Sequence, residues 1–86
     1  MIFVTRVVYL GPGEEMPHVG DEGRWLIIEA KDGKFYGSGS SWKRSGEWVG
    51  YVSLSENDVT LDDALAAAHQ WAANYDVPTI WVQLAP

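Results

Sequence analysis

The chain has 86 residues, of which 47% are hydrophobic and 13% aromatic, and it contains no cysteine. This length supports one hydrophobic core, and we therefore expect one domain over residues 1–86. The lack of thiols excludes disulfides, thiolate nucleophiles and cysteine-ligated metal sites. No apolar run approaches the roughly 20 residues that cross a bilayer, and residues 1–4 lack the basic start of a signal peptide. We therefore expect a cytoplasmic protein that makes no membrane contact.

Charge is distributed unevenly along the chain. Six basic and twelve acidic side chains give a formal net charge of −6. Residues 1–44 hold all six bases together with six acids, whereas residues 45–86 hold six acids and no base. Nucleic-acid-binding domains usually carry a basic surplus, because phosphate neutralisation supplies most of their affinity. The charge therefore disfavours a nucleic-acid partner, and it suits either solubility alone or a basic protein partner.

The first two thirds of the chain predict four strands. Residues 2–10 are β-branched and aromatic, which is typical of a strand, and residues 11–23 contain four glycines and two prolines, which predict a loop. Three more strands are predicted at residues 24–31, 35–44 and 47–55. Two-residue turns are expected to join them at Asp32-Gly33 and at Ser45-Gly46, because these pairs tolerate the positive φ angles of a type I′ turn.

The last third predicts a helix and a final strand. Thr60 is a suitable N-cap for a helix over residues 61–75, and Asp62 and Asp63 favour the positive end of its dipole. An apolar stripe follows one side of this helix, formed by Leu61, Ala64, Leu65, Ala68, Ala72 and Tyr75. Pro78 ends the helix, and residues 79–84 form the last strand. We therefore predict an α+β fold: a single antiparallel sheet in the order β-β-β-β-α-β, with one helix packed on one face.

Counting outward from the two-residue turns assigns side chains to the two faces of the sheet. The count places Ala30 opposite Phe35, Trp42 opposite Val49 and Ser40 opposite Tyr51. The face expected beneath the helix collects Leu26, Ile28, Ala30, Phe35, Trp48, Val52 and Leu54. The other face collects Trp25, Ile27, Tyr36, Trp42, Val49 and Tyr51. Because one helix covers only one face, we predict that this second set is an exposed interaction surface. The alternative is a second small core beneath the loop of residues 11–23 or the first strand.

Residues that could carry chemistry are few. His18 lies in a loop with Glu14, Glu15, Asp21 and Glu22, and imidazole and carboxylate groups are ligands for divalent cations. A loop that contains prolines and glycines does not hold such ligands in fixed geometry, so we interpret this segment as a solvated acidic loop.

The other candidates do not form a catalytic pattern. His69 and Asp62 are separated by about 10 Å along the helix axis, which is too far for a catalytic dyad. The serine-rich residues 37–41 do not match a nucleophile elbow, and residues 11–13 are too short for a phosphate-binding loop. We therefore predict no enzymatic activity, no cofactor and no metal.

Three binding functions follow from these features. The preferred one is a protein–protein interaction module that uses the aromatic sheet face, including self-association about a two-fold axis. The second is an acidic inhibitor or antitoxin that docks residues 45–86 on a basic partner. The third is single-stranded nucleic-acid binding through Trp42, Lys43 and Arg44 together with Trp25 and Tyr51.

Residues 58–68 carry a resemblance to a known family. They read DVTLDDALAAA after the predicted strands, which is similar to the corresponding stretch of HicB-type antitoxins. Those small proteins place several strands before such a helix and one strand after it, so the resemblance implies that the chain binds and silences a toxin. The Pro-Gly-Cys-like segment that is typical before that helix is absent here.

Overall fold

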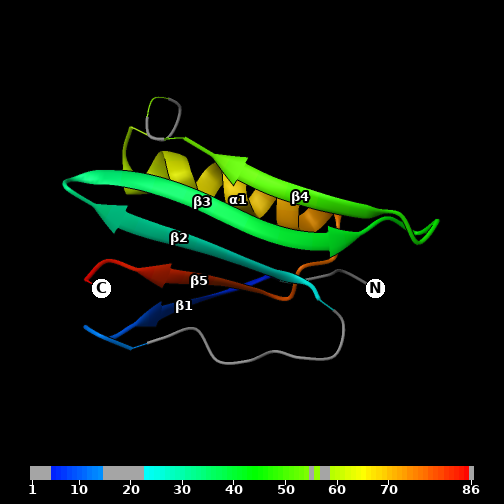
Figure 1. Cartoon of the computed structure of the whole chain (residues 1–86), viewed down its shortest axis with the longest axis horizontal. Coiled ribbons are helices and arrows are strands. Elements are labelled where there is room, and N and C mark those ends of the chain that lie inside the picture. Colours follow the sequence, from blue (N-terminus) through cyan, green and yellow to red (C-terminus); the bar gives the residue numbers. More distant parts are fainter. Residues whose placement is uncertain (1–4, 15–22, 55, 57–58, 86) are drawn as a thin grey trace.

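The computed structural model describes residues 5–14, 23–54, 56 and 59–85. The elements follow the chain in the predicted order (Figure 1). They are β1 (Arg6–Leu10), β2 (Trp25–Lys31), β3 (Lys34–Trp42), β4 (Trp48–Ser53), α1 (Leu61–Asn74) and β5 (Thr79–Gln83). The chain is thus an α+β fold with one five-stranded sheet and one helix in its described part.

The sheet is mixed, and the prediction of a purely antiparallel sheet is wrong. Its strand order is β1-β5-β2-β3-β4. Strands β2, β3 and β4 form an antiparallel meander, whereas β5 lies between β1 and β2 and runs parallel to both. The reason is the helix: β4 runs in the same direction as β2, and α1 then carries the chain back along the sheet. Strand β5 therefore enters in the direction of β4 and can only pair parallel to β2.

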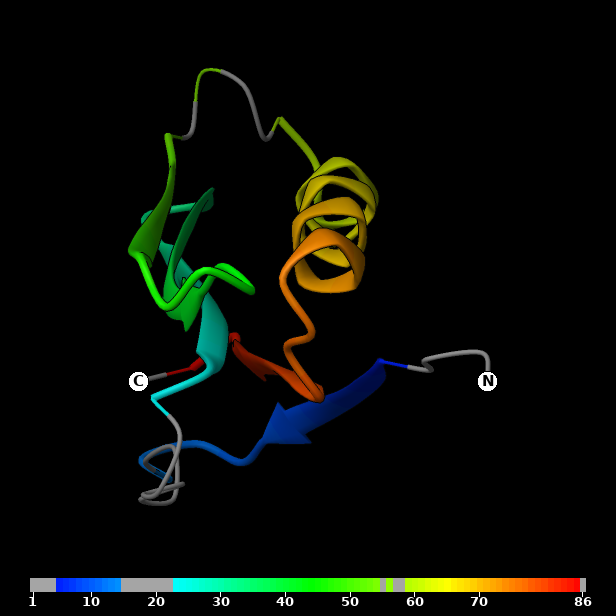
Figure 2. The ribbon, with the colours of Figure 1, turned by 90° about the vertical axis from the view of Figure 1, so that its right-hand side faces the viewer.

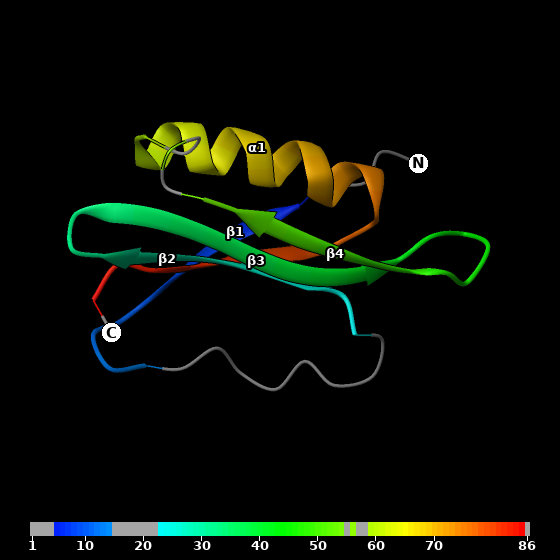
Figure 3. The same ribbon diagram turned by 45° about the horizontal axis from the view of Figure 1, so that its top comes forward.

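Helix α1 covers one face of the sheet (Figures 2 and 3). It packs against β2, β3 and β5. The fully buried side chains of this layer are Leu26, Ile28, Ala64, Ala68, Ala72, Val77, Ile80 and Val82. Small alanines on the helix let it lie close to the larger aliphatic side chains of β2 and β5, which fill the space between the two layers.

Glycines in β3 bring neighbouring strands close together. A Cβ atom on Gly39 would stand 2.6 Å from the backbone oxygen of Trp25, and one on Gly37 would stand 2.8 Å from the ring of Tyr51. Neither position has room for a side chain, because the backbone of β2 at Gly39 and the Tyr51 ring of β4 at Gly37 occupy the space that a Cβ would need.

The first hairpin forms as predicted. Asp32 and Gly33 have φ angles of 54° and 74°, as a type I′ turn requires. Ala30 accordingly pairs with Phe35, and Trp25 pairs with Ser40.

The second hairpin differs from the prediction by one residue. The Lys43 N–H donates to the Glu47 oxygen at 2.8 Å, and the Gly46 N–H donates to the Lys43 oxygen at 2.9 Å. These bonds define a three-residue connection over residues 44–46, in which Gly46 has a φ of 91°. Trp42 therefore pairs with Trp48, rather than with Val49 as predicted.

This shift exchanges the faces of the sheet on which the β4 side chains lie. Because side chains alternate between the faces, a slip of one residue exchanges the two sets of β4 side chains. Val49 and Tyr51 lie on the helix side, opposite Ser41 and Gly39, while Trp48 and Val52 lie on the other side. The prediction that Trp48, Val52 and Leu54 are core residues is wrong, because these side chains are exposed.

Both ends of helix α1 are held by side chains. The Thr60 hydroxyl accepts from the Asp63 N–H at 3.1 Å, which confirms the predicted N-cap. The last turn contains no basic residue. A cation is supplied instead by Arg24, which donates to the Tyr75 oxygen at 2.9 Å. The buried Ser41 hydroxyl donates to the same oxygen at 2.6 Å and accepts from Arg24 at 3.1 Å.

Candidate interaction surface

Four large hydrophobic side chains form an exposed surface on the helix-free face of β3 and β4. They are Tyr36, Trp42, Trp48 and Val52, with exposed fractions of 36%, 38%, 57% and 78%. Paired residues share a face, and so do residues two apart on one strand. Trp42 pairs with Trp48, and Val52 pairs with Ser38. Because Tyr36, Ser38 and Trp42 are separated by even numbers of residues, all four side chains lie on one face. We call these four residues the outer strip.

Trp48 is held in place by its neighbours within the sheet. Its indole Nε1 donates to the Ser40 hydroxyl oxygen at 2.9 Å, and the Ser40 hydroxyl donates to the Gly23 oxygen at 2.9 Å. A Cβ on Gly50 would stand 2.6 Å from Cη2 of the indole, so the ring lies directly against the strand at this glycine. Trp48 therefore presents a fixed apolar surface, and little side-chain entropy is lost when it binds.

The inner part of the same face is half-buried. Trp81 of β5 is flanked by Val8 and Ile27, and Trp25 pairs with Ser40 in the neighbouring row. Trp25, Ile27 and Trp81 are each partly accessible to solvent. The alternative prediction, a second small core beneath the loop of residues 11–23, depends on residues 15–22, which lie outside the described residues.

Two members of the predicted surface belong to the opposite face. The Tyr51 ring packs against Trp71 of the helix, with ring centroids 5.2 Å apart, and Val49 shares its face. The predicted set of Trp25, Ile27, Tyr36, Trp42, Val49 and Tyr51 thus keeps its first four members on the helix-free face and loses the last two. Sequence reasoning missed Trp48 and Val52 because both were assigned to the core by the shifted register.

Strand β4 also forms a free edge. Within the described residues it pairs only with β3. The bond from the Lys43 N–H to the Glu47 oxygen fixes the alternation of hydrogen-bonded pairs along the ladder. The backbone groups of Val49, Tyr51 and Ser53 therefore point toward β3. Those of Trp48, Gly50 and Val52 point outward.

This edge lacks the usual protection against pairing with another chain. Strands at sheet edges commonly carry charges, a proline or a bulge that prevent such pairing. Residues 48–54 read WVGYVSL and contain neither a charge nor a proline. An apolar face and an unprotected edge therefore coincide on one strand.

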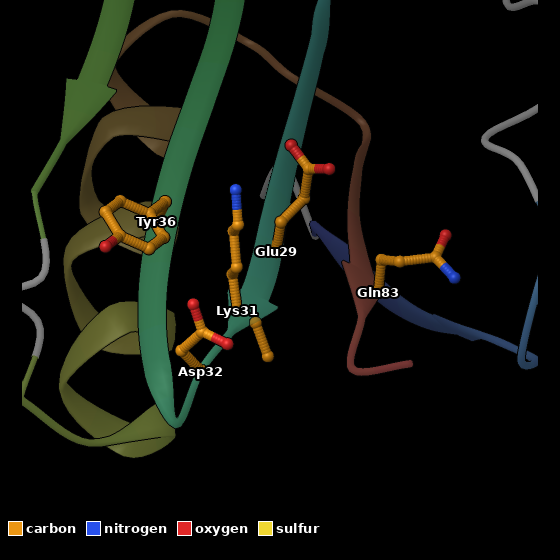
Figure 4. Close-up of a pocket in the computed structure, with 6 residues that line it drawn as sticks. Glu29, Lys31, Asp32, Tyr36 and Gln83 are labelled. Carbon is orange, nitrogen blue, oxygen red and sulfur yellow. The ribbon is translucent and has the colours of Figure 1, made fainter. Parts of the chain in front are cut away.

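A hollow of about 750 Å³ lies beside the outer strip, at the Asp32-Gly33 end of the sheet. The described residues that line it include Glu29, Lys31, Asp32, Tyr36 and Gln83 (Figure 4). The Gln83 amide already donates to the oxygens of Gly11 and Ala85, at 3.3 and 3.0 Å. Its Nε2 therefore links the segment after β5 to the loop that follows β1.

The residues considered for metal binding are not brought together in the described part of the chain. His18, Glu15, Asp21 and Glu22 lie outside the described residues. The Glu14 carboxylate accepts from the Gly11 N–H at 2.8 Å. In the described ranges, no three His, Asp or Glu side chains gather into a metal-binding group.

The remaining candidates lie apart or serve the fold. His69 and Asp62 are exposed on the helix. In the serine-rich segment of residues 37–41, Ser40 and Ser41 bond to the backbone oxygens of Gly23 and Tyr75.

Comparisons of the chain with protein-family models, curated proteins and solved structures found no match. The toxin-silencing function implied by the resemblance of residues 58–68 to HicB-type antitoxins therefore stays a prediction. The single helix of the described part is too short and too polar to cross a membrane.

Proposed function

We propose that this chain is a non-catalytic protein-interaction module that binds its partner through the outer strip. The observation that carries this proposal is the position of Trp48, which is 57% exposed although its ring is held by a hydrogen bond and a glycine contact. A rigid, exposed tryptophan next to other aromatic side chains is the kind of group that contributes most to protein interfaces.

The polar groups of this face support a binding role. Ser40 bonds to Trp48 and to the backbone at Gly23, so its hydroxyl positions the indole rather than a substrate. Lys43 forms an ion pair with Glu47 at 3.4 Å at one end of the strip. The centre of the strip is thus apolar and its end is charged, which is the usual arrangement of a protein interface.

Site-specific photo-crosslinking tests this proposal. A benzophenone side chain is placed at Val52, which is 78% exposed on the outer strip, and in a matched variant at Val59, which is 68% exposed outside the sheet. In cells that produce the chain, we expect a protein adduct from position 52 and none from position 59. Equal labelling from both positions, or no adduct from position 52, would contradict the proposal.

Single-stranded nucleic acid is a second candidate ligand. Lys31 and Lys34 pair with each other on the helix-free face, next to Tyr36, so bases and an aromatic ring share one surface. The ion pair between Lys43 and Glu47 weakens this candidate, because it neutralises one of the bases at the other end of the strip.

A basic protein surface is the third candidate. Asp62, Asp63 and Asp76 are exposed around helix α1, whose last turn contains no base. Docking by these carboxylates would weaken steeply as salt is added, whereas docking by the outer strip would not.

A further inference from the structure

We propose that the outer strip binds a second copy of this chain, through antiparallel pairing of β4 with β4 of the other copy about a two-fold axis at Gly50. This inference rests on the proposed function and names the partner. The two sheets would join into one continuous sheet, with both helices on the same face and both outer strips on the other.

The backbone of β4 is suited to such pairing. The outward-pointing groups belong to Trp48, Gly50 and Val52, which are spaced symmetrically about Gly50. In an antiparallel pair centred there, Gly50 meets Gly50 of the second copy, and Trp48 meets Val52 of the second copy. Each outward N–H and C=O group of these three residues then has a partner.

The side chains match in the same register. On the outer face, each Trp48 pairs with Val52 of the other copy, which is the most exposed large hydrophobic side chain of the chain's described part. On the helix face, Val49 lies beside Tyr51 of the other copy. Every apolar residue of the strand thus contacts an apolar residue of the other copy. A two-fold interface requires this self-complementarity, because both copies use the same surface.

Charges at the two ends of β4 are complementary. The hairpin before β4 carries Lys43 and Arg44, and the chain after β4 carries Glu56, all of them exposed. Antiparallel pairing brings the start of one β4 next to the end of the other. Arg44 of one copy therefore lies near Glu56 of the second copy, twice in each dimer.

Sedimentation measures the association directly. We expect wild type to be a dimer at high micromolar concentration and to dissociate on dilution. Val52→Lys should weaken association at least about tenfold, because it removes an apolar contact at each of two symmetric positions and brings two ammonium groups into an interface where they lose part of their hydration. Val59→Lys is the matched control and should leave association unchanged. A wild-type chain that stays monomeric at millimolar concentration would overturn the proposal.

Because the chain has no cysteine, an engineered cysteine reports the register without interference. Gly50→Cys is combined with Trp48→Ala, because the indole occupies the space that a Cβ at Gly50 would need. This variant should form an intermolecular disulfide, since paired residues in this register have Cα atoms about 5.5 Å apart. Val52→Cys should not, because its two copies stand about 14 Å apart along the strands. If Gly50→Cys does not fold, Trp48→Cys combined with Val52→Cys tests the same register. Crosslinking at position 52 alone would overturn it.

A charge exchange tests the ends of the interface. Arg44→Glu and Glu56→Lys should each weaken the dimer about three- to tenfold, since each removes two ion pairs and adds two repulsions. The double variant restores both pairs and should recover most of the loss. Equal weakening in the single and double variants would contradict the proposed pairing.

These outcomes separate this inference from the proposed function. A monomeric wild type whose position 52 still crosslinks to a different protein would overturn self-association but leave the interaction module intact. A dimer that is unaffected by Val52→Lys, with no adduct from position 52, would overturn both.

Discussion

The carbonyl oxygen of Tyr75, at the end of helix α1, depends on two side chains from distant parts of the chain. Arg24 and Ser41 both donate to it, at 2.9 and 2.6 Å. Ser41 is fully buried, so its hydroxyl has no access to bulk water, whereas Arg24 and Tyr75 are each partly exposed. Arg24 also supplies the positive charge that the last helical turn lacks.

Ser41→Ala is therefore expected to lower the free energy of unfolding by about 1–3 kcal/mol, because it removes a buried hydrogen bond and leaves Arg24 with one partner fewer. Urea denaturation monitored by tryptophan fluorescence measures the change. Ser45→Ala, in the exposed turn, is the control and should change stability by less than about 0.5 kcal/mol. Similar losses in both variants would show that the buried hydroxyl does not hold the helix end.

At the scale of elements, the second hairpin decides which side chains form the candidate surface. The dipeptide Ser45-Gly46 fits a two-residue turn, and it also fits the last two positions of a three-residue turn that ends in a glycine with positive φ. The structure has the second arrangement, with Gly46 at a φ of 91°. Local sequence does not distinguish these turns, because both need glycine at the same place.

The one-residue difference in the second hairpin loop leaves the predicted elements unchanged but changes the predicted faces of the β4 side chains. The strands, the helix cap and the first hairpin follow from local patterns, and all were predicted. Which face each β4 side chain takes depends on the parity of the loop length, and Trp48 and Tyr51 exchanged places on that account. Strong local signals thus predicted the elements. The residues of the candidate surface depended on the number of residues in the second hairpin loop, which only the folded chain shows.

Hydrogen exchange along β4 tests this register. At a concentration low enough to keep the chain monomeric, the amides of Val49, Tyr51 and Ser53 should exchange slowly, because they point toward β3. The amides of Trp48 and Gly50 should exchange quickly, because they point outward. Protection measured residue by residue with NMR gives the alternation. The opposite alternation, with slow exchange at Trp48 and Gly50, would contradict the observed pairing.

At the scale of the whole molecule, the position of β5 could not be derived by adding hairpins together. Its parallel pairing with β1 and β2 joins segments far apart in the chain. One signal was present: residues 79–82 read TIWV, with no regular polar alternation, which is typical of a strand covered on both faces. Four of the five β5 residues are indeed buried. Strand β5 is inserted between β1 and β2, and the sheet is mixed because helix α1 returns the chain so that β5 runs in the same direction as β2.

The distribution of charge over the whole molecule bears on the choice of ligand. The net charge is −6, and the bases near the outer strip are partly neutralised, since Lys43 is paired with Glu47. The long-range field therefore repels a polyanion, although the aromatic side chains would suit base stacking. For the outer strip, this balance favours an uncharged protein surface over nucleic acid.

We therefore expect a short single-stranded oligonucleotide to leave the tryptophan emission unchanged at low salt, where the net charge of −6 repels phosphates most strongly, and also at about 0.15 M salt, where that repulsion is screened. Acrylamide should quench part of the same emission, because Trp48 is exposed, and this shows that the signal can report binding. Saturable quenching by the oligonucleotide that fades as salt is added would contradict the expectation and favour nucleic acid as the ligand. In that event Lys34→Glu should reduce the quenching, because it reverses a charge beside Tyr36 on the helix-free face. An unchanged response in that variant would place the nucleic acid elsewhere on the molecule.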